Sequence, residues 1–233
     1  VIKQQRKLES FWSMPNQVRV NGEHNATLND SNKIAKVYMV FSHATKEAAY
    51  EAADQLIAIN NESQVFVETP LISFDGFATP SKLIVLGDGL IEALNESGID
   101  KNIVVAGLIS HEWAHQVQFI NSVQWFSYEA GKWPQSAEFT RNTELEADFF
   151  SSYFLTHKRG GAYNWKKVIG FNNLFFDIGD CAFTEADHHG TPKQRLAASK
   201  LGYAVASQTW PKGHVLTPSQ LHKIFKEKLN TLL

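Results

Sequence analysis

The sequence contains a single cysteine, Cys181, among 233 residues. One cysteine cannot form a disulfide within the chain, which excludes a small scaffold held by cross-links, and it does not indicate a redox compartment. The longest apolar run covers residues 103–109, far short of the ~20 residues that a membrane-spanning helix needs. The sequence therefore predicts no membrane-spanning segment.

The chain also has no excess of either charge. Its 22 basic and 24 acidic side chains nearly cancel, so neither a nucleic acid nor a membrane surface is expected as a partner. This balance predicts a soluble protein, and no pattern predicts an oligomeric state. The chain begins at Val1 rather than Met, which predicts a missing leader and export, with the cytoplasm as the alternative.

What the sequence does contain is enough apolar material for one core. Hydrophobic residues make up 43% of the chain and aromatic residues 12%, so residues 1–233 are predicted to form one domain. Apolar spacing and turn residues predict mainly strands early and helices late, which is an α+β order. In the first part we expect helices at 2–12, 45–59 and 88–94 and strands at 17–20, 35–41, 64–68, 71–74 and 82–86. In the second part we expect helices at about 102–121, 137–158, 163–178, 192–206 and 217–231.

The helix expected from about residue 102 carries the pattern His111-Glu112-Trp113-Ala114-His115. Residues four apart in a helix lie about 40° from each other on one face, so His111 and His115 can bind one ion. Two neutral imidazoles supply half of a tetrahedral zinc site, and Glu112 can hold a water at the metal and accept its proton. By chance the pattern arises in roughly one such chain in fifty, and a lone helical His pair is more often a surface feature. A third ligand is therefore needed.

The next predicted helix supplies carboxylates. Glu144 and Asp148 are four apart and share a face, whereas Glu146 points about 200° away from Glu144. We expect Glu144 to be the third zinc ligand and Asp148 to accept the second ring N–H of a ligand histidine, which fixes that ring's tautomer. Three protein ligands leave one position for water. The alternative is a solvated face on which Arg141 pairs with these carboxylates.

A further histidine pattern lies at residues 187–192, Asp-His-His-Gly-Thr-Pro, before another predicted helix. A histidine in a loop that opens onto a helix can donate a hydrogen bond to the oxyanion of a tetrahedral intermediate, which lowers the barrier by a few kcal/mol. His189 is the candidate for this role. The alternative is a capping or loop-packing histidine.

Together these motifs resemble the gluzincin metallopeptidases, in which a second helix carries Glu-x-x-x-Asp. The order of segments 79–86, 88–94 and 111–115 is similar to the soluble domain of HtpX and CAAX-prenyl-protease relatives, the minigluzincins. His-Gly-Thr-Pro-x-Gln-Arg at residues 189–195 is similar to the neutral zinc metallopeptidases of bacteria. The resemblance covers residues 70–200, and residues 1–60 form an extension without a recognised motif.

The resemblance implies a zincin-like fold in which an N-terminal sheet packs on the His-Glu-x-x-His helix and a mainly helical half follows. It implies that residues 82–86 form an edge strand that could pair with an extended substrate. The roles that it implies are zinc ligation for His111, His115 and Glu144, general base for Glu112, ligand support for Asp148 and transition-state donor for His189.

The sequence therefore predicts a zinc-dependent endopeptidase that acts on a peptide or protein substrate, with Zn²⁺ as cofactor and Glu112 as general base. One alternative is a non-catalytic zinc-binding or scaffold domain that keeps the ligands without a usable cleft. A second is an autoinhibited or narrowly specific peptidase whose cleft is covered by residues 125–133 or 1–30.

Overall fold

The structure is a computed structural model that describes residues 1–23, 31–32, 35, 39, 44–62, 76–96, 98–182, 189–208, 211 and 213–233. This part of the chain is mostly helical with one small sheet, so the α+β prediction is confirmed. In chain order the elements are α1 (Ile2–Phe11), β1 (Arg19–Glu23), α3 (Lys46–Glu62), β2 (Gly76–Thr79), β3 (Leu83–Gly87), α4 (Asp88–Glu96), α5 (Lys101–Phe126), α6 (Ala137–Thr156), α7 (Trp165–Ala182), α8 (Pro192–Gln208), α9 (Pro218–Lys228) and the 3₁₀ helix η3 (Leu229–Thr231).

The described sheet has three strands in the order β1-β3-β2. β1 runs parallel to β3, with Arg19 opposite Leu83, and β2 runs antiparallel to β3, with Thr79 also opposite Leu83. The predicted edge strand at 82–86 is therefore wrong, because β3 pairs on both sides and is the central strand. β2 was not predicted, since its four residues are too short to show an alternating pattern.

Three other predicted strands have different outcomes. The strand expected at 17–20 is shifted and runs from Arg19 to Glu23. The strand expected at 35–41 is wrong at its two described residues, Ala35 and Met39, which are helical. The strands expected at 64–68 and 71–74 lie outside the described residues.

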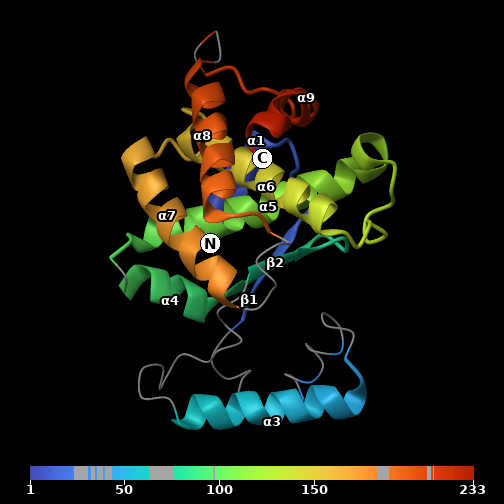
Figure 1. Cartoon of the computed structure of the whole chain (residues 1–233). Coiled ribbons are helices and arrows are strands. Elements are labelled where there is room, and N and C mark those ends of the chain that lie inside the picture. Colours follow the sequence, from blue (N-terminus) through green and yellow to red (C-terminus); the bar gives the residue numbers. More distant parts are fainter. Residues whose placement is uncertain are drawn as a thin grey trace.

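α5 is the central helix of the fold. In Figure 1 it crosses the middle of the molecule, with the sheet and α4 on one side and α6, α8 and α9 on the other. Asp100 fixes its start, because the carboxylate accepts a hydrogen bond from the Asn102 backbone N–H at 2.9 Å. Ile103, Ile109 and Trp113 are buried along it. A helix that is apolar on several faces is stable only when other elements cover it, which is what places the His-Glu-x-x-His pattern in the interior.

Two glycines allow helices to approach closely. A Cβ built on Gly107 of α5 would lie 2.1 Å from the Phe171 ring of α7, and one built on Gly202 of α8 would lie 2.3 Å from the Phe149 carbonyl oxygen of α6. Any larger side chain at these positions would overlap its neighbour. α6 therefore packs directly against α8, backbone to backbone.

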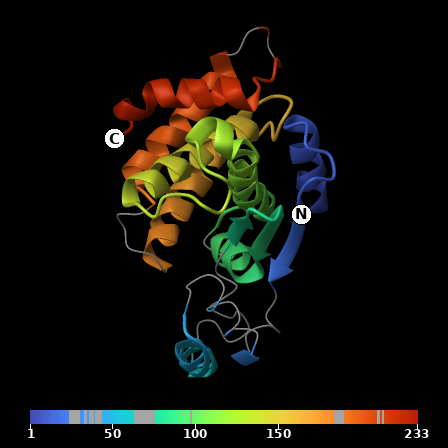
Figure 2. The same ribbon diagram turned by 90° about the vertical axis from the view of Figure 1, so that its right-hand side faces the viewer.

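α3 packs outside this core. Ala49, Ala53 and Leu56 form a separate small cluster with Ala35, and Figures 1 and 2 show α3 apart from the other described helices. The single domain over residues 1–233 stays a prediction. Within the described part, no helix combines the length and the apolarity needed to cross a bilayer.

His157 joins the end of α6 to the segment before α9. The buried imidazole donates from Nε2 to the His214 carbonyl oxygen at 3.0 Å, and its Nδ1 accepts from the Arg159 backbone N–H at 3.1 Å. This arrangement requires the neutral ring, because a proton on Nδ1 would face the Arg159 N–H. Burial lowers the pKa of His157, the hydrogen bond to His214 opposes this, and the charge of Arg159 lowers the pKa further.

The contact of Gly202 with α6 predicts a stability change. Gly202→Ala should lower the free energy of unfolding by about 1–3 kcal/mol, because the new methyl group overlaps the α6 backbone. Gly170→Ala is the matched control: it lies in α7 with nothing within 4 Å of its built Cβ, and should raise that free energy by up to ~1 kcal/mol. Urea unfolding of both variants tests this, and a Gly202→Ala protein as stable as Gly170→Ala would contradict the close approach.

The lowered pKa of His157 predicts a pH dependence of stability. The unfolded chain takes up a proton on this ring near pH 6.5, whereas the folded chain does so only at lower pH. The contribution of His157 to the free energy of unfolding is therefore complete above pH 6.5 and is lost as the pH falls through the pKa of the folded state. His157→Gln should therefore flatten the decline of unfolding free energy between about pH 7 and 5. Parallel urea titrations measure this, and identical slopes for parent and variant would contradict it.

Candidate metal centre

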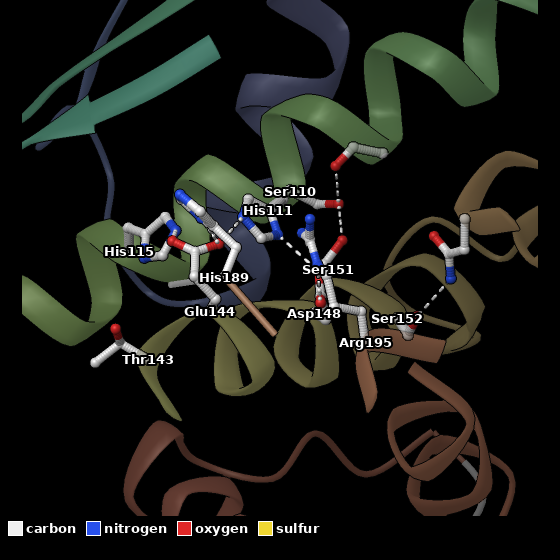
Figure 3. Close-up of polar contacts among 12 residues, drawn as sticks. Ser110, His111, His115, Thr143, Glu144, Asp148, Ser151, Ser152, His189 and Arg195 are labelled. Carbon is white, nitrogen blue, oxygen red and sulfur yellow. Dashed lines mark hydrogen bonds and ion pairs between the residues drawn. The ribbon is translucent and has the colours of Figure 1, made fainter. Parts of the chain in front are cut away.

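Three side chains from two helices converge on one point. His111 and His115 of α5 direct their Nε2 atoms at the Glu144 carboxylate of α6, at 3.2 Å to Oε2 and 3.3 Å to Oε1. One possible ligand atom from each residue lies within 4.8 Å of the others, so this group could bind a metal ion. Figure 3 shows both rings and the carboxylate pointing together. The structure thus brings together the three residues that the sequence predicted as ligands.

α6 is placed so that its acidic face meets α5. Ser136 caps its start by accepting a hydrogen bond from the Phe139 backbone N–H. The Glu144 side chain is 14% exposed and that of Asp148 is 2% exposed. The alternative of a solvated acidic face is therefore wrong, because Glu144 faces the imidazoles of α5 and Asp148 pairs with Arg195 of α8.

The outer nitrogen of His111 has a carboxylate partner. His111 Nδ1 lies 3.0 Å from Asp148 Oδ1, in the position that the sequence predicted for Asp148. Asp148 in turn accepts two hydrogen bonds from Arg195 of α8, at 2.8 Å from Nε and 3.0 Å from Nη2. The Arg195 guanidinium also lies over the Phe176 ring, at 4.5 Å from its centroid. Sequence analysis placed Arg195 in a motif but gave it no partner.

The outer nitrogen of His115 has a different partner, Gln118. His115 Nδ1 lies 2.8 Å from Gln118 Oε1, and Gln118 Nε2 donates to the Thr143 carbonyl oxygen at 2.8 Å and to Glu146 Oε2 at 3.0 Å. Sequence analysis missed Gln118 and Glu146 as parts of the site. The one available signal was the position of Gln118, three residues after His115 on a helix, where side chains are neighbours.

The histidines and carboxylates at the centre shift one another's pKa. Burial alone lowers the pKa of His111, but its close contacts with the Asp148 and Glu144 carboxylates raise it to about 10. Burial raises the pKa of Glu144, whereas the charge of His115 and the contacts with the rings of His111, His115 and His189 lower it well below its usual range. The cluster therefore favours positive charge at its centre, as a cation site does.

Glu112 and His189 flank the three candidate ligands. Glu112 is buried on α5 directly after His111, and a Cβ built on Gly76 of β2 would lie 3.9 Å from Glu112 Oε1. His189, just before α8, places Nδ1 3.7 Å from Glu144 Oε2, and its side chain is 32% exposed. The structure thus brings both predicted catalytic residues to the centre. Their catalytic roles stay predictions.

The hairpin of β2 and β3 is fixed to α5 beside the centre. Gln116, buried next to His115, donates from Nε2 to the Thr79 carbonyl oxygen at 3.0 Å and to the Leu83 carbonyl oxygen at 3.1 Å. These atoms lie at the closed end of the hairpin, where Thr79 pairs with Leu83. The sheet and the candidate ligands are therefore positioned by the same turn of α5.

The buried pair of Asp148 and Arg195 predicts a large effect of removing the cation. Arg195→Leu removes the cation that donates to both oxygens of the buried Asp148 carboxylate, which should lower the free energy of unfolding by about 3–5 kcal/mol. The double variant Asp148→Asn/Arg195→Leu should recover part of this loss, because the carboxylate that lost its cation is removed as well.

Urea unfolding with a chelator present measures these values. Arg6→Leu is the control, because Arg6 is exposed on α1 and should change the unfolding free energy by less than ~0.5 kcal/mol. A loss for Arg195→Leu no larger than that of the control would show that the pair does not stabilise the fold.

Comparison with known proteins adds no assignment to this geometry. No protein-family model, no curated protein and no solved structure matches the chain. The function must therefore be inferred from the site itself.

Proposed function

We propose that this chain is a zinc-dependent endopeptidase with a zincin-like fold. One observation carries the proposal: the Glu144 carboxylate meets the Nε2 atoms of His111 and His115, at 3.2 and 3.3 Å, beside Glu112 on the same helix. A metal site that only stabilises a fold has no need of a glutamate outside the ligand set. A hydrolytic site does need one, as a proton acceptor.

The donor set fits zinc. Two imidazoles and one carboxylate suit this ion, and three protein ligands are the number typical of catalytic zinc sites, where a fourth position is open. A bound zinc ion polarises a carbonyl group and lowers the pKa of a water toward ~7. The outer nitrogens of both rings lie close to oxygen atoms, at 3.0 Å for His111 and 2.8 Å for His115, and acceptors at the outer nitrogens leave Nε2 of each neutral ring to bind the metal.

The remaining chemistry belongs to residues of the chain. Glu112 accepts a proton from the attacking water and then passes it to the leaving amine nitrogen. His189 donates a ring hydrogen bond to the oxyanion that develops on the scissile carbonyl. Its 32% exposed side chain supports this role, because it can reach a substrate while Glu144 anchors the ring 3.7 Å away.

The aromatic residues at 125–133 pack against other side chains of the helical half. The Trp125 ring stacks on His222 of α9 at a centroid distance of 4.3 Å, and Trp133 packs against Phe119 and Phe139 at 4.7 and 5.5 Å. These contacts place the aromatic side chains in a corner between α5, α6 and α9. This packing supports an ordinary structural role for them rather than a cover over the metal centre.

Glu112→Gln tests the proposed chemistry. The variant should keep zinc, because Glu112 is not in the ligand group, and should lose cleavage of a peptide library by about 10²- to 10⁴-fold, the usual contribution of a general base. Zinc content by elemental analysis and cleavage with and without a chelator are the measurements.

Glu129→Gln is the matched control, because this exposed glutamate forms a surface ion pair with Lys132 at 2.7 Å; it should cleave like the parent. A Glu112→Gln protein that cleaves like the parent would remove Glu112 as the base. A parent that is fully loaded with zinc but shows no chelator-sensitive cleavage would favour the non-catalytic metal-binding alternative.

A further inference from the structure

The two candidate ligand histidines are each supported by a series of buried side chains, and the two series differ in length. His111 is supported by Asp148, and this first series ends at Arg195 of α8. His115 is supported by Gln118, which continues to Glu146 and ends on His222 of α9. The second series thus links the candidate metal site to a helix that contributes no ligand to it.

Gln118 can support His115 only if its amide has one orientation. An amide carries an acceptor oxygen and a donor nitrogen, and their assignment follows from the surrounding groups. Gln118 Nε2 lies 2.8 Å from the Thr143 carbonyl oxygen and 3.0 Å from a Glu146 carboxylate oxygen, which are both acceptors. Gln118 Oε1 therefore faces His115 Nδ1 at 2.8 Å, and that nitrogen must carry the hydrogen. In the neutral ring this leaves Nε2 as the nitrogen with the lone pair, and Nε2 is the atom that would bind the metal beside Glu144.

Glu146 fixes the amide together with the Thr143 carbonyl oxygen, and His222 holds Glu146 in place. Glu146 is 1% exposed, so its carboxylate needs hydrogen-bond donors in place of water. Gln118 donates to Oε2, and His222 Nδ1 lies 2.6 Å from Oε1. The two carboxylate oxygens are therefore held from opposite sides, one by α5 and one by α9.

The position of His222 is itself well determined. Its ring stacks on Trp125 at 4.3 Å with an interplanar angle of 9°. α9 begins with a reciprocal capping box between Thr217 and Gln220, and Leu221 and Phe225 are buried on its inner face. Packing of α9 against α5 and α6 thus sets where the His222 Nδ1 atom lies.

We propose that His222 is a positioning residue for the metal site: through Glu146 and Gln118 it fixes the tautomer and the orientation of His115. This inference rests on the proposed zinc site. It implies that docking of α9 and binding of the metal are coupled, and such coupling acts in both directions. Loss of the His222 donor weakens metal binding, and metal binding stabilises the docked α9.

The experiment compares three variants with the parent. His222→Leu removes the donor, and His222→Asn restores one, because the asparagine amide nitrogen can occupy the place of Nδ1. His214→Leu is the control, since this histidine is exposed and its side chain is outside the series. Zinc affinity is measured by competition with a chelating dye, and the ligand field is measured from the visible spectrum of the cobalt(II) protein. Neither readout requires peptidase activity.

His222→Leu should bind zinc about 10-fold or more weakly, as expected for loss of an outer partner of a ligand, and should shift the cobalt spectrum. His222→Asn should recover most of the affinity, and His214→Leu should match the parent. A folded His222→Leu protein with the zinc affinity and cobalt spectrum of the parent overturns the proposal. An affinity loss that His222→Asn does not reduce also overturns it.

A measurement on the parent alone covers the case in which His222→Leu does not fold. Zinc should slow the hydrogen exchange of amides in α9 around His222 more than of those in α1, because the series connects α9 to the site. Equal effects on α9 and α1 overturn the proposal. If the parent binds zinc, shows the slower exchange in α9 and cleaves no peptide, this inference is supported and the peptidase function is contradicted. If the parent binds neither zinc nor cobalt, both are overturned.

Discussion

The structure depends on three buried carboxylates of one helix. Removing a carboxylate from water has a high free-energy cost unless hydrogen-bond donors or cations replace the solvent. Glu144 faces the two imidazoles of α5, Asp148 accepts from Arg195 of α8, and Glu146 accepts from His222 of α9. Each partner comes from a different helix, so α6 can bury its acids only when α5, α8 and α9 dock in one arrangement. The same requirement that shapes the helical half also builds the candidate metal centre.

The same contacts hold the side chains of the candidate metal centre in place. The outer nitrogens of His111 and His115 each face a side-chain oxygen, and those partners are in turn held by further buried groups. Gln116 adds a link to the hairpin of β2 and β3 from the adjacent position on α5. Little rearrangement is therefore needed to receive a metal ion, which reduces the free-energy cost of binding.

The sequence predicted the parts of the site that follow from helix geometry. The spacing of His111 and His115 and that of Glu144 and Asp148 fix which side chains share a face, and this is a local property. The partners of Gln118 and His222 could not be predicted, because they depend on how α5, α6 and α9 dock in three dimensions. The amphipathic spacing predicted the helices of the second half for the same local reason, and the observed helices differ from the predicted ones only at their ends.

The strands were predicted less well, since a strand depends on partners distant in sequence. Residues 82–86 were expected at an edge, yet β3 pairs with β1 on one side and β2 on the other. Nothing local to these residues reveals that β1, more than sixty positions earlier, is its neighbour. Ala35 and Met39, which were expected in a strand and are helical, show the other weakness, because short apolar segments fit a helix and a strand equally.

The alternating acids of α6 also restrict how that helix can lie along its axis. Glu144, Glu146 and Asp148 occupy every second position, with Leu145 and Ala147 between them. Sliding α6 by one residue in either direction would carry all three carboxylates away from their partners at once, because the residues between and beside them, at 143, 145, 147 and 149, carry no charge. An inserted or deleted residue just before this segment therefore cannot be absorbed by slippage, and α6 has one allowed axial position.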